Sequence, residues 1–163
     1  MATVKRISYA ALLAGAIAGG VLTTSSEASA RSSSSLSYVV HNAGIAYLTK
    51  TGLTRSFPGR LQTGDEIFTR DLLFQGSTKV GYDNENCTVT FDNNDVCRVL
   101  AVFTGKGDVE STWIWIGRNS SQLGPSHFSG IIVGGTGAFE RARGQFDASA
   151  LPDGTLRITA HLG

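Results

Sequence analysis

From Gly64 to the end of the chain, short runs of β-branched and aromatic residues alternate with clusters of glycine, asparagine and aspartate. Many short strands at this spacing are typical of a β-sandwich or a β-barrel. No segment combines ten or more residues of helical periodicity with capping residues at both ends. The pattern therefore predicts an all-β domain. The eight expected strands are Glu66–Leu73, Thr78–Tyr82, Cys87–Phe91, Cys97–Phe103, Asp108–Ile116, Phe128–Val133, Arg143–Ala150 and Leu156–Leu162.

The run Asp108–Ile116 carries large apolar side chains on both of its faces. Trp113 and Trp115 share one face, and Ile114 and Ile116 share the other, because side chains alternate along a strand. We expect one face to fill the interior of the domain. The other is expected to meet a neighbouring subunit or a cover formed by N-terminal residues, unless both tryptophans are simply core residues.

The first thirty residues have the three parts of a secretory signal peptide in order. Lys5 and Arg6 are positive, residues 9–22 are almost wholly apolar, and the small residues 28–30 (Ala-Ser-Ala) end the segment. The apolar run is shorter than the roughly 20 residues that cross a bilayer as a helix. We therefore expect residues 1–30 to be a cleaved signal peptide, with an uncleaved membrane anchor as the alternative.

The mature protein is accordingly expected to be secreted, extracellular or periplasmic, with no membrane association after signal cleavage. Residues 31–45 begin with the polar run RSSSSLS and are expected to be a flexible tether. Residues 46–163 are then the folded domain.

The charge balance of the mature chain excludes one class of partner. Without Lys5, Arg6 and Glu27, 12 basic and 12 acidic residues remain. A nucleic-acid-binding protein usually carries a basic patch, so no nucleic-acid partner is expected.

The chain has two cysteines, Cys87 and Cys97. In an oxidising compartment such a pair most often forms a disulfide, although free thiols, one of them lining a pocket, are the alternative. A four-residue loop at 92–95 would place Cys87 opposite Leu100, so the bridge requires a shifted register or a β-bulge. Two cysteines and three scattered histidines offer no spacing for a metal site.

The richest glycine cluster is Gly134-Gly135-Thr136-Gly137. A phosphate-binding loop is followed by a helix and ends in Lys-Ser or Lys-Thr, and neither feature occurs here. The glycines are better explained by a tight turn with positive backbone angles. No serine lies in a Gly-x-Ser-x-Gly motif, so a hydrolase triad is not indicated.

Three stretches resemble the barrel shared by allene oxide cyclases, dirigent proteins and bacterial relatives. They are Gly64-Asp65 with residues 71–74 (DLLF), residues 79–81 (KVG) followed by Cys87, and residues 134–144 (GGTGAFERARG). The resemblance implies an eight-stranded antiparallel β-barrel of calycin type over residues 46–163, with a hydrophobic cavity. It also implies a small hydrophobic ligand, no cofactor or metal, and a homo-oligomer, a trimer by analogy.

The resemblance also suggests residues of the site. Asp71 falls where the family has a polar residue facing the cavity, and Arg143 matches the arginine of the dirigent-type Ala-Arg-Gly. We expect both to be catalytic, Asp71 by proton transfer and Arg143 by hydrogen bonding to a developing oxyanion. The alternatives are a structural Arg143–Asp71 ion pair and an Asp71 that faces water. The expected cavity-lining residues are Phe68, Trp113, Trp115 and Phe139.

The leading hypothesis is a secreted barrel that cyclises, isomerises or stereochemically directs a small hydrophobic molecule of polyketide, lipid or phenolic type. A non-catalytic carrier of such a ligand is the first alternative. An interaction protein, whose barrel would be too tightly filled to admit a ligand, is the second. An acid–base pair pointing into the cavity favours catalysis over transport.

Overall fold

The computed structural model describes residues 34–91, 94–116 and 126–163. The expected signal peptide lies outside these residues, and no helix among them is long and apolar enough to cross a membrane. The elements are β1 (Ser34–Thr49), β2 (Gly52–Thr54), β3 (Glu66–Gln75), β4 (Thr78–Val89), β5 (Asp95–Phe103), β6 (Gly107–Trp115), β7 (His127–Gly135), the 3-10 turn η1 (Gly137–Phe139), β8 (Gly144–Ala150) and β9 (Leu156–Leu162).

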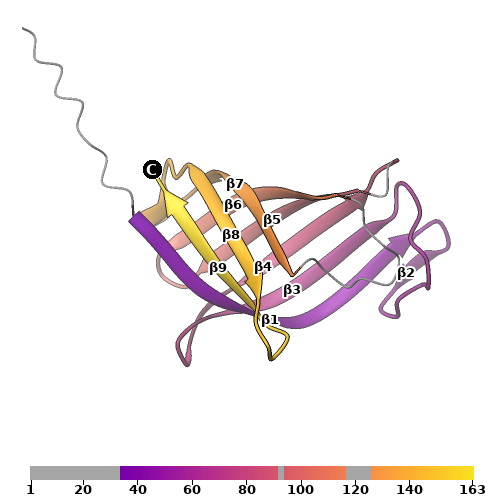
Figure 1. The fold of residues 1–163 in the computed structure, drawn as a ribbon, viewed down its shortest axis with the longest axis horizontal. Coiled ribbons are helices and arrows are strands. Elements are labelled where there is room, and N and C mark those ends of the chain that lie inside the picture. Colours follow the sequence, from indigo (N-terminus) through magenta and orange to yellow (C-terminus); the bar gives the residue numbers. More distant parts are fainter. Residues whose placement is uncertain (1–33, 92–93, 117–125) are drawn as a thin grey trace, which may run out of the picture. The chain divides into compact units, whose positions relative to one another are not determined.

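Eight strands form a closed antiparallel barrel, as the sequence predicted. From β3 to β9 each strand pairs with the next along the chain, and β1 pairs with both β3 and β9. Figure 1 shows the strands running obliquely around a common interior, with the β1–β2 hairpin extending beyond them. Closure gives each of the eight strands of the wall a hydrogen-bonded neighbouring strand on both sides.

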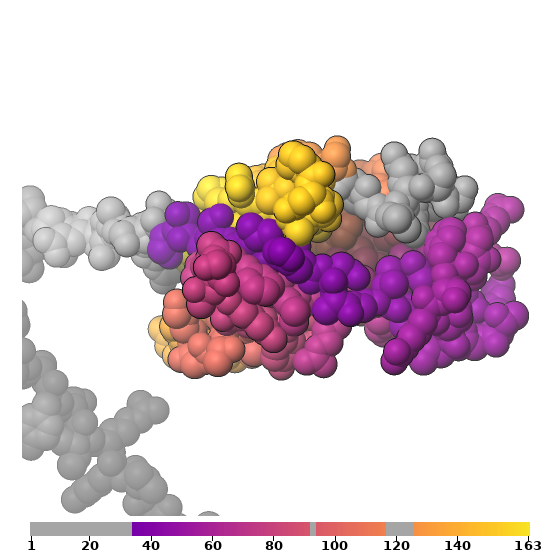
Figure 2. All heavy atoms as spheres, turned by 90° about the horizontal axis from the view of Figure 1, so that it is seen from below, coloured from indigo at the N-terminus to yellow at the C-terminus, as the bar shows by residue number. Residues whose placement is uncertain are grey.

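Strand β1 closes the barrel. Its first half pairs with β9, from Ser34 opposite Leu162 to Val40 opposite Leu156, and its second half continues along β3. A bulge between Asn42 and Gly44 accompanies the change of partner. In Figure 2, β1 is the indigo band between the yellow C-terminal strands and the pink central segment.

The tether expected at residues 31–45 is therefore, over its described residues, a barrel strand. The serines that suggested flexibility alternate with apolar residues that pack against the core, Leu36 and Tyr38. Backbone pairing with β9, from Ser34 to Val40, stabilises this segment in spite of its polar composition.

Strand β4 combines two of the expected strands. The polar residues 83–86 (Asp-Asn-Glu-Asn) separate the expected strands Thr78–Tyr82 and Cys87–Phe91, as a turn would, but in the structure they continue one strand from Thr78 to Val89. Both neighbours hold them in place, since Asp83 lies opposite Asp71 of β3 and opposite Ala101 of β5. The number of strands was thus correct because β1 replaces the strand that this merger removes.

The expected alternation along β6 is confirmed. Trp113 and Trp115 are buried in the barrel, with 8% and 9% of their surface exposed. Ile114 and Ile116 lie on the outside, with 55% and 78% exposed.

The cysteines form the expected disulfide, Cys87–Cys97. The two residues lie directly opposite each other on β4 and β5, and the last pair before the turn is Val89 with Asp95. Of the two expected solutions, the structure has the shifted register and no bulge in this ladder, because the turn begins earlier in the chain than the aspartates and asparagines suggested. Within the turn, the backbone N–H of Thr90 donates to the carbonyl of Asn94 at 2.7 Å.

The glycine-rich segment forms the tight turn that the sequence predicted. Gly137 has a φ of 59° and begins η1. A Cβ atom at Gly135 would lie 2.6 Å from the carbonyl oxygens of Asp108 and Phe139, so the backbone approaches β6 closely here. The same motif ends at Gly144, whose φ is 146° and which lies against the backbone of His161.

Gly144→Ala should destabilise the protein by more than about 2 kcal/mol, because the new Cβ would overlap the carbonyl oxygen of His161 at a φ that alanine rarely adopts. Gly134→Ala is the matched control, since its Cβ would meet only Arg143 Nη1, at 3.6 Å. It should change the free energy of unfolding by less than about 1 kcal/mol. Urea denaturation measures the free energy of unfolding of both variants. Equal losses in the two would contradict the steric overlap inferred at Gly144.

Candidate functional site

A hollow of about 50 Å³, partly open to solvent, lies in the interior of the barrel. This is room for a few water molecules and is several-fold less than the ~300 Å³ at the lower end of ligand sites. A larger ligand therefore requires lining side chains to move. The lining residues are Tyr38, Val40, Asp71, Asp83, Glu85, Val99, Ser111, Trp113, Phe128, Phe146, Leu156 and Ile158.

Three carboxylates meet on one side of this hollow. Asp83 and Glu85 are two residues apart on β4, so both point inward. Asp71 of β3 lies directly opposite Asp83 in the sheet register. Asp71 and Asp83 are buried, with 8% and 5% of their surface exposed.

Hydrogen bonds hold all three carboxyl groups, and those of Asp71 and Asp83 hydrogen-bond to each other. Asn42 Nδ2 donates to Asp71 Oδ1 at 2.8 Å, and Thr69 Oγ1 lies 3.2 Å from Asp71 Oδ2. Trp113 Nε1 donates to Glu85 Oε1 at 2.7 Å. Among the described residues, Asp83 Oδ1 has no hydrogen-bond partner.

Burial raises the pKa of all three groups. It raises the pKa of Asp83 to about 8, with further increases from the charges of Asp71 and Glu85. It raises the pKa of Glu85 to about 7, against the hydrogen bond from Trp113. The pKa of Asp71 is also raised by burial, although hydrogen bonds from Thr69 and Asn42 oppose the shift. Carboxyl groups of this site are therefore partly protonated at neutral pH and can gain or lose protons there.

Aromatic rings form the other side of the hollow. Trp113 stacks on Phe128 with their ring centroids 4.1 Å apart, and Phe128 meets Phe146 edge to face at 6.0 Å. Tyr38 packs edge to face on Phe103 at 5.3 Å, and burial followed by the charge of Asp83 raises its pKa above the ordinary tyrosine value. The interior thus combines an acidic side with an aromatic side.

The structure brings together some of the sequence-predicted residues. Asp71 and Trp113 line the hollow. Trp115 is buried in the core but is not among the lining residues. Phe139 lies on η1 and packs against Phe103 with centroids 5.2 Å apart.

Phe68 and Arg143 lie outside the cavity in which they were expected. Phe68 is on the outer face of β3, where it borders a groove of about 510 Å³ together with Arg98 and Leu100. Arg143 is exposed and donates from Nη1 to the carbonyl of Ala142 at 2.8 Å. Alternation explains both positions, because Ile67 and Ala142 occupy the inward places next to them.

The disulfide lies beside the acidic cluster. The sulfurs of Cys87 and Cys97 and a carboxylate oxygen of Glu85 lie within 4.8 Å of one another. Such a group resembles a set of metal ligands, but both sulfurs are bonded to each other. Thiolates, which are the form of cysteine that binds metals, are therefore not present here.

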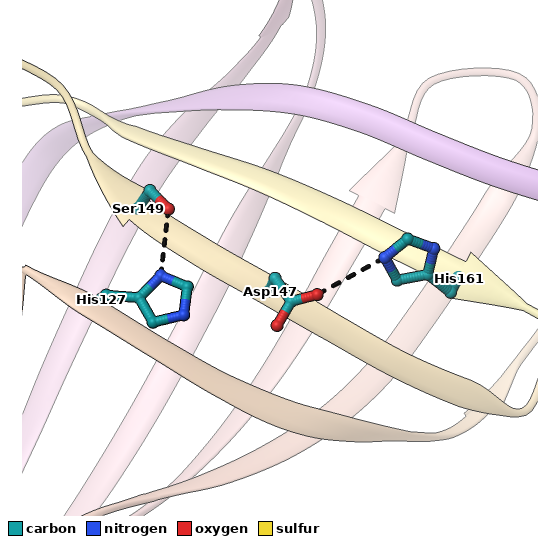
Figure 3. A network of polar contacts seen from close by, with 4 residues as sticks. All are labelled: His127, Asp147, Ser149 and His161. Carbon is teal, nitrogen blue, oxygen red and sulfur yellow. Dashed lines mark hydrogen bonds and ion pairs between the residues drawn. The ribbon is translucent and has the colours of Figure 1, made fainter.

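A second polar cluster lies on the outer face of β7, β8 and β9 (Figure 3). His127 Nδ1 is 3.1 Å from Ser149 Oγ, and His161 Nε2 is 3.4 Å from Asp147 Oδ2. The serine and the aspartate pair with different histidines, so the four residues do not form the serine–histidine–aspartate relay of a hydrolase. His161 and Asp147 are more than half exposed, and the cluster is separate from the hollow.

The fold is shared with barrels of known structure. A pyocyanin demethylase matches with a TM-score of 0.63 and 17% identity, over 80% of this chain and 100% of that one. A pterocarpan synthase dirigent protein matches with a TM-score of 0.57 and 15% identity, over 81% and 94%. An exo-specific intermolecular Diels-Alderase matches with a TM-score of 0.55 and 10% identity, over 80% and 98%.

At these identities the likeness shows the fold alone, and it agrees with the resemblance to dirigent and cyclase barrels seen in the sequence. No protein-family model matches the sequence, and no curated protein matches it. The chain is a closed antiparallel barrel similar in fold to these proteins, and carboxylates line part of its interior.

The raised pKa values make stability depend on pH. A carboxyl whose pKa is higher in the folded state stabilises the fold while protonated, and this contribution is lost as pH rises through the folded pKa. The free energy of unfolding should therefore fall between pH 4 and pH 9. Asp83→Asn should reduce that fall by at least ~1 kcal/mol, since one pKa unit corresponds to about 1.4 kcal/mol.

Urea denaturation at several pH values measures this dependence. Asp147→Asn is the matched control, because Asp147 is exposed on the outer face. An Asp83→Asn variant with the same pH profile as the parent protein would show that Asp83 is not protonated in the folded barrel.

Proposed function

We propose that this chain is exported and that its barrel cyclises, isomerises or stereochemically directs a small hydrophobic molecule without a cofactor. The observation that carries the proposal is the group of inward carboxylates, Asp71, Asp83 and Glu85, in a closed aromatic-lined interior. The fold likeness to a Diels-Alderase and to a dirigent protein supports the same class of chemistry. A carrier needs only apolar lining, whereas this interior contains groups suited to proton transfer.

Each carboxylate has a role that its environment suits. Glu85 and Asp83 have pKa values of about 7 and about 8, so both protonated and ionised forms are populated near neutral pH. One group then donates a proton to the substrate while another accepts one, as general acid–base catalysis requires. Asp71, held by Asn42 and Thr69, positions and polarises Asp83 across the β3–β4 pair.

The aromatic side of the hollow supplies orientation. Trp113, Phe128 and Phe146 present apolar rings to a substrate whose reacting atoms must be held together. Such positioning contributes roughly 7–11 kcal/mol in well-oriented intramolecular reactions. Because the hollow is small, Phe128 or a neighbouring ring moves to admit the substrate.

The test begins with the molecule that copurifies with the exported protein, identified by native mass spectrometry. Cyclisation and isomerisation leave the mass unchanged, so chiral chromatography follows the product. Asp83→Asn should lower turnover about 10²-fold or more while the molecule still binds. Arg143→Ala should turn over at the parent rate, because Arg143 is exposed outside the hollow.

A bound molecule that is recovered unchanged, at the rate seen in buffer, would favour the carrier. Export itself is tested by the mass of the mature chain, which should begin after residue 30.

A further inference from the structure

Every titratable side chain that lines the hollow is an acid. Asp71, Asp83 and Glu85 supply carboxyl groups, and Tyr38 supplies a phenol. Among the described residues that line the hollow, none is a lysine, an arginine or a histidine. Strands β5 to β9 contribute only apolar, hydroxyl and indole groups to the lining. When these acids ionise, they give the interior a negative potential, which the low dielectric of the barrel strengthens.

One carboxylate oxygen on this acidic side lacks a hydrogen-bond donor in the described part of the chain, which indicates that a ligand supplies one. Asp83 is 5% exposed, and its Oδ1 has no hydrogen-bond partner among the described residues. A buried carboxylate oxygen without a donor is costly. A molecule in the hollow that brings a positive charge or a polar hydrogen would satisfy this atom.

The aromatic side of the hollow favours a positively charged ligand over one that brings only a polar hydrogen. Tyr38, Trp113, Phe128 and Phe146 present ring surfaces to the same space. Aromatic faces attract cations through their quadrupoles, and the attraction grows when the cation is desolvated. Rings facing carboxylates suit a compact organic cation with an apolar body better than they suit a neutral alcohol.

We infer that the hollow prefers small molecules that have an apolar body and a positive charge, whether permanent or developed during the reaction. This inference rests on the proposed function, because it names the substrate class of the same site. Asp83 Oδ1 faces the charge, Glu85 adds to the field, and Trp113 and Phe146 cover the apolar body.

Protons compete with such a ligand for the same groups. The pKa of Asp83 is raised to about 8 and that of Glu85 to about 7, so both lose protons as pH rises from 6 to 9. Asp71 on β3 acts on both as a negative charge, and Asp95 on β5 acts on Glu85. Tyr38 on β1 is the remaining titratable group in the lining, and its raised pKa keeps it neutral in this range. Cation binding should therefore strengthen with pH.

The experiment compares N-methylpyridinium with toluene, which have nearly the same shape and differ in charge. The full-length protein is titrated with each at pH 6 and pH 9, and binding is followed by the NMR signal of the Trp113 indole N–H. Phe128→Ala serves as a second host with a larger hollow, should the parent barrel be too tight. Asp83→Asn is the test variant, and the exposed Asp147→Asn is its control.

We expect N-methylpyridinium to bind at least tenfold more tightly than toluene at pH 9 in at least one host. This preference should shrink at pH 6 and in Asp83→Asn, and should persist in Asp147→Asn. Equal or tighter binding of toluene would overturn the inference and leave the proposed function standing. If neither probe binds in either host, the inference and the proposed function both fail. If the preference for N-methylpyridinium persists in Asp83→Asn, Asp83 does not have the role assigned to it.

Discussion

Pairing of β1 with both β9 and β3 is the interaction on which the rest of the structure depends. Without it the remaining seven strands would be an open sheet with two free edges and one face open to water. Closure gives that face an enclosed interior. Only in such an enclosure does burial raise the proton affinity of Asp83 and Glu85.

The all-β class and most strands followed from alternation and turn residues, which are local signals, whereas the closed barrel was what the resemblance to dirigent and cyclase barrels implied. Leu156–Leu162 was predicted with the bounds that the structure gives. The two errors have a common origin. The polar residues 83–86 and the serines of residues 34–37 resemble a turn and a tether, yet residues 83–86 pair with both β3 and β5, and residues 34–37 pair with β9. Long-range pairing of this kind overrides local composition.

The site was less predictable than the fold. Asp71 was identified, but Asp83 and Glu85 were missed because they fell in the expected turn. The alternation of Gly81, Asp83, Glu85 and Cys87 along one face was the available signal, since the buried disulfide fixes that face as inward. Tyr38 was not predicted to line the hollow, because it lies in the segment expected to be a tether. Arg143 was chosen from a motif, but a motif does not specify on which side of the wall a residue lies.

Strand β9 determines when the carboxylates become buried. Ser34 of β1 meets Leu162 of β9, so the wall is completed only by residues at the far end of the chain. A nascent chain that lacks β9 already contains Asp71, Asp83 and Glu85, but water still reaches them. Their raised pKa values are therefore acquired only when β9 has paired with β1.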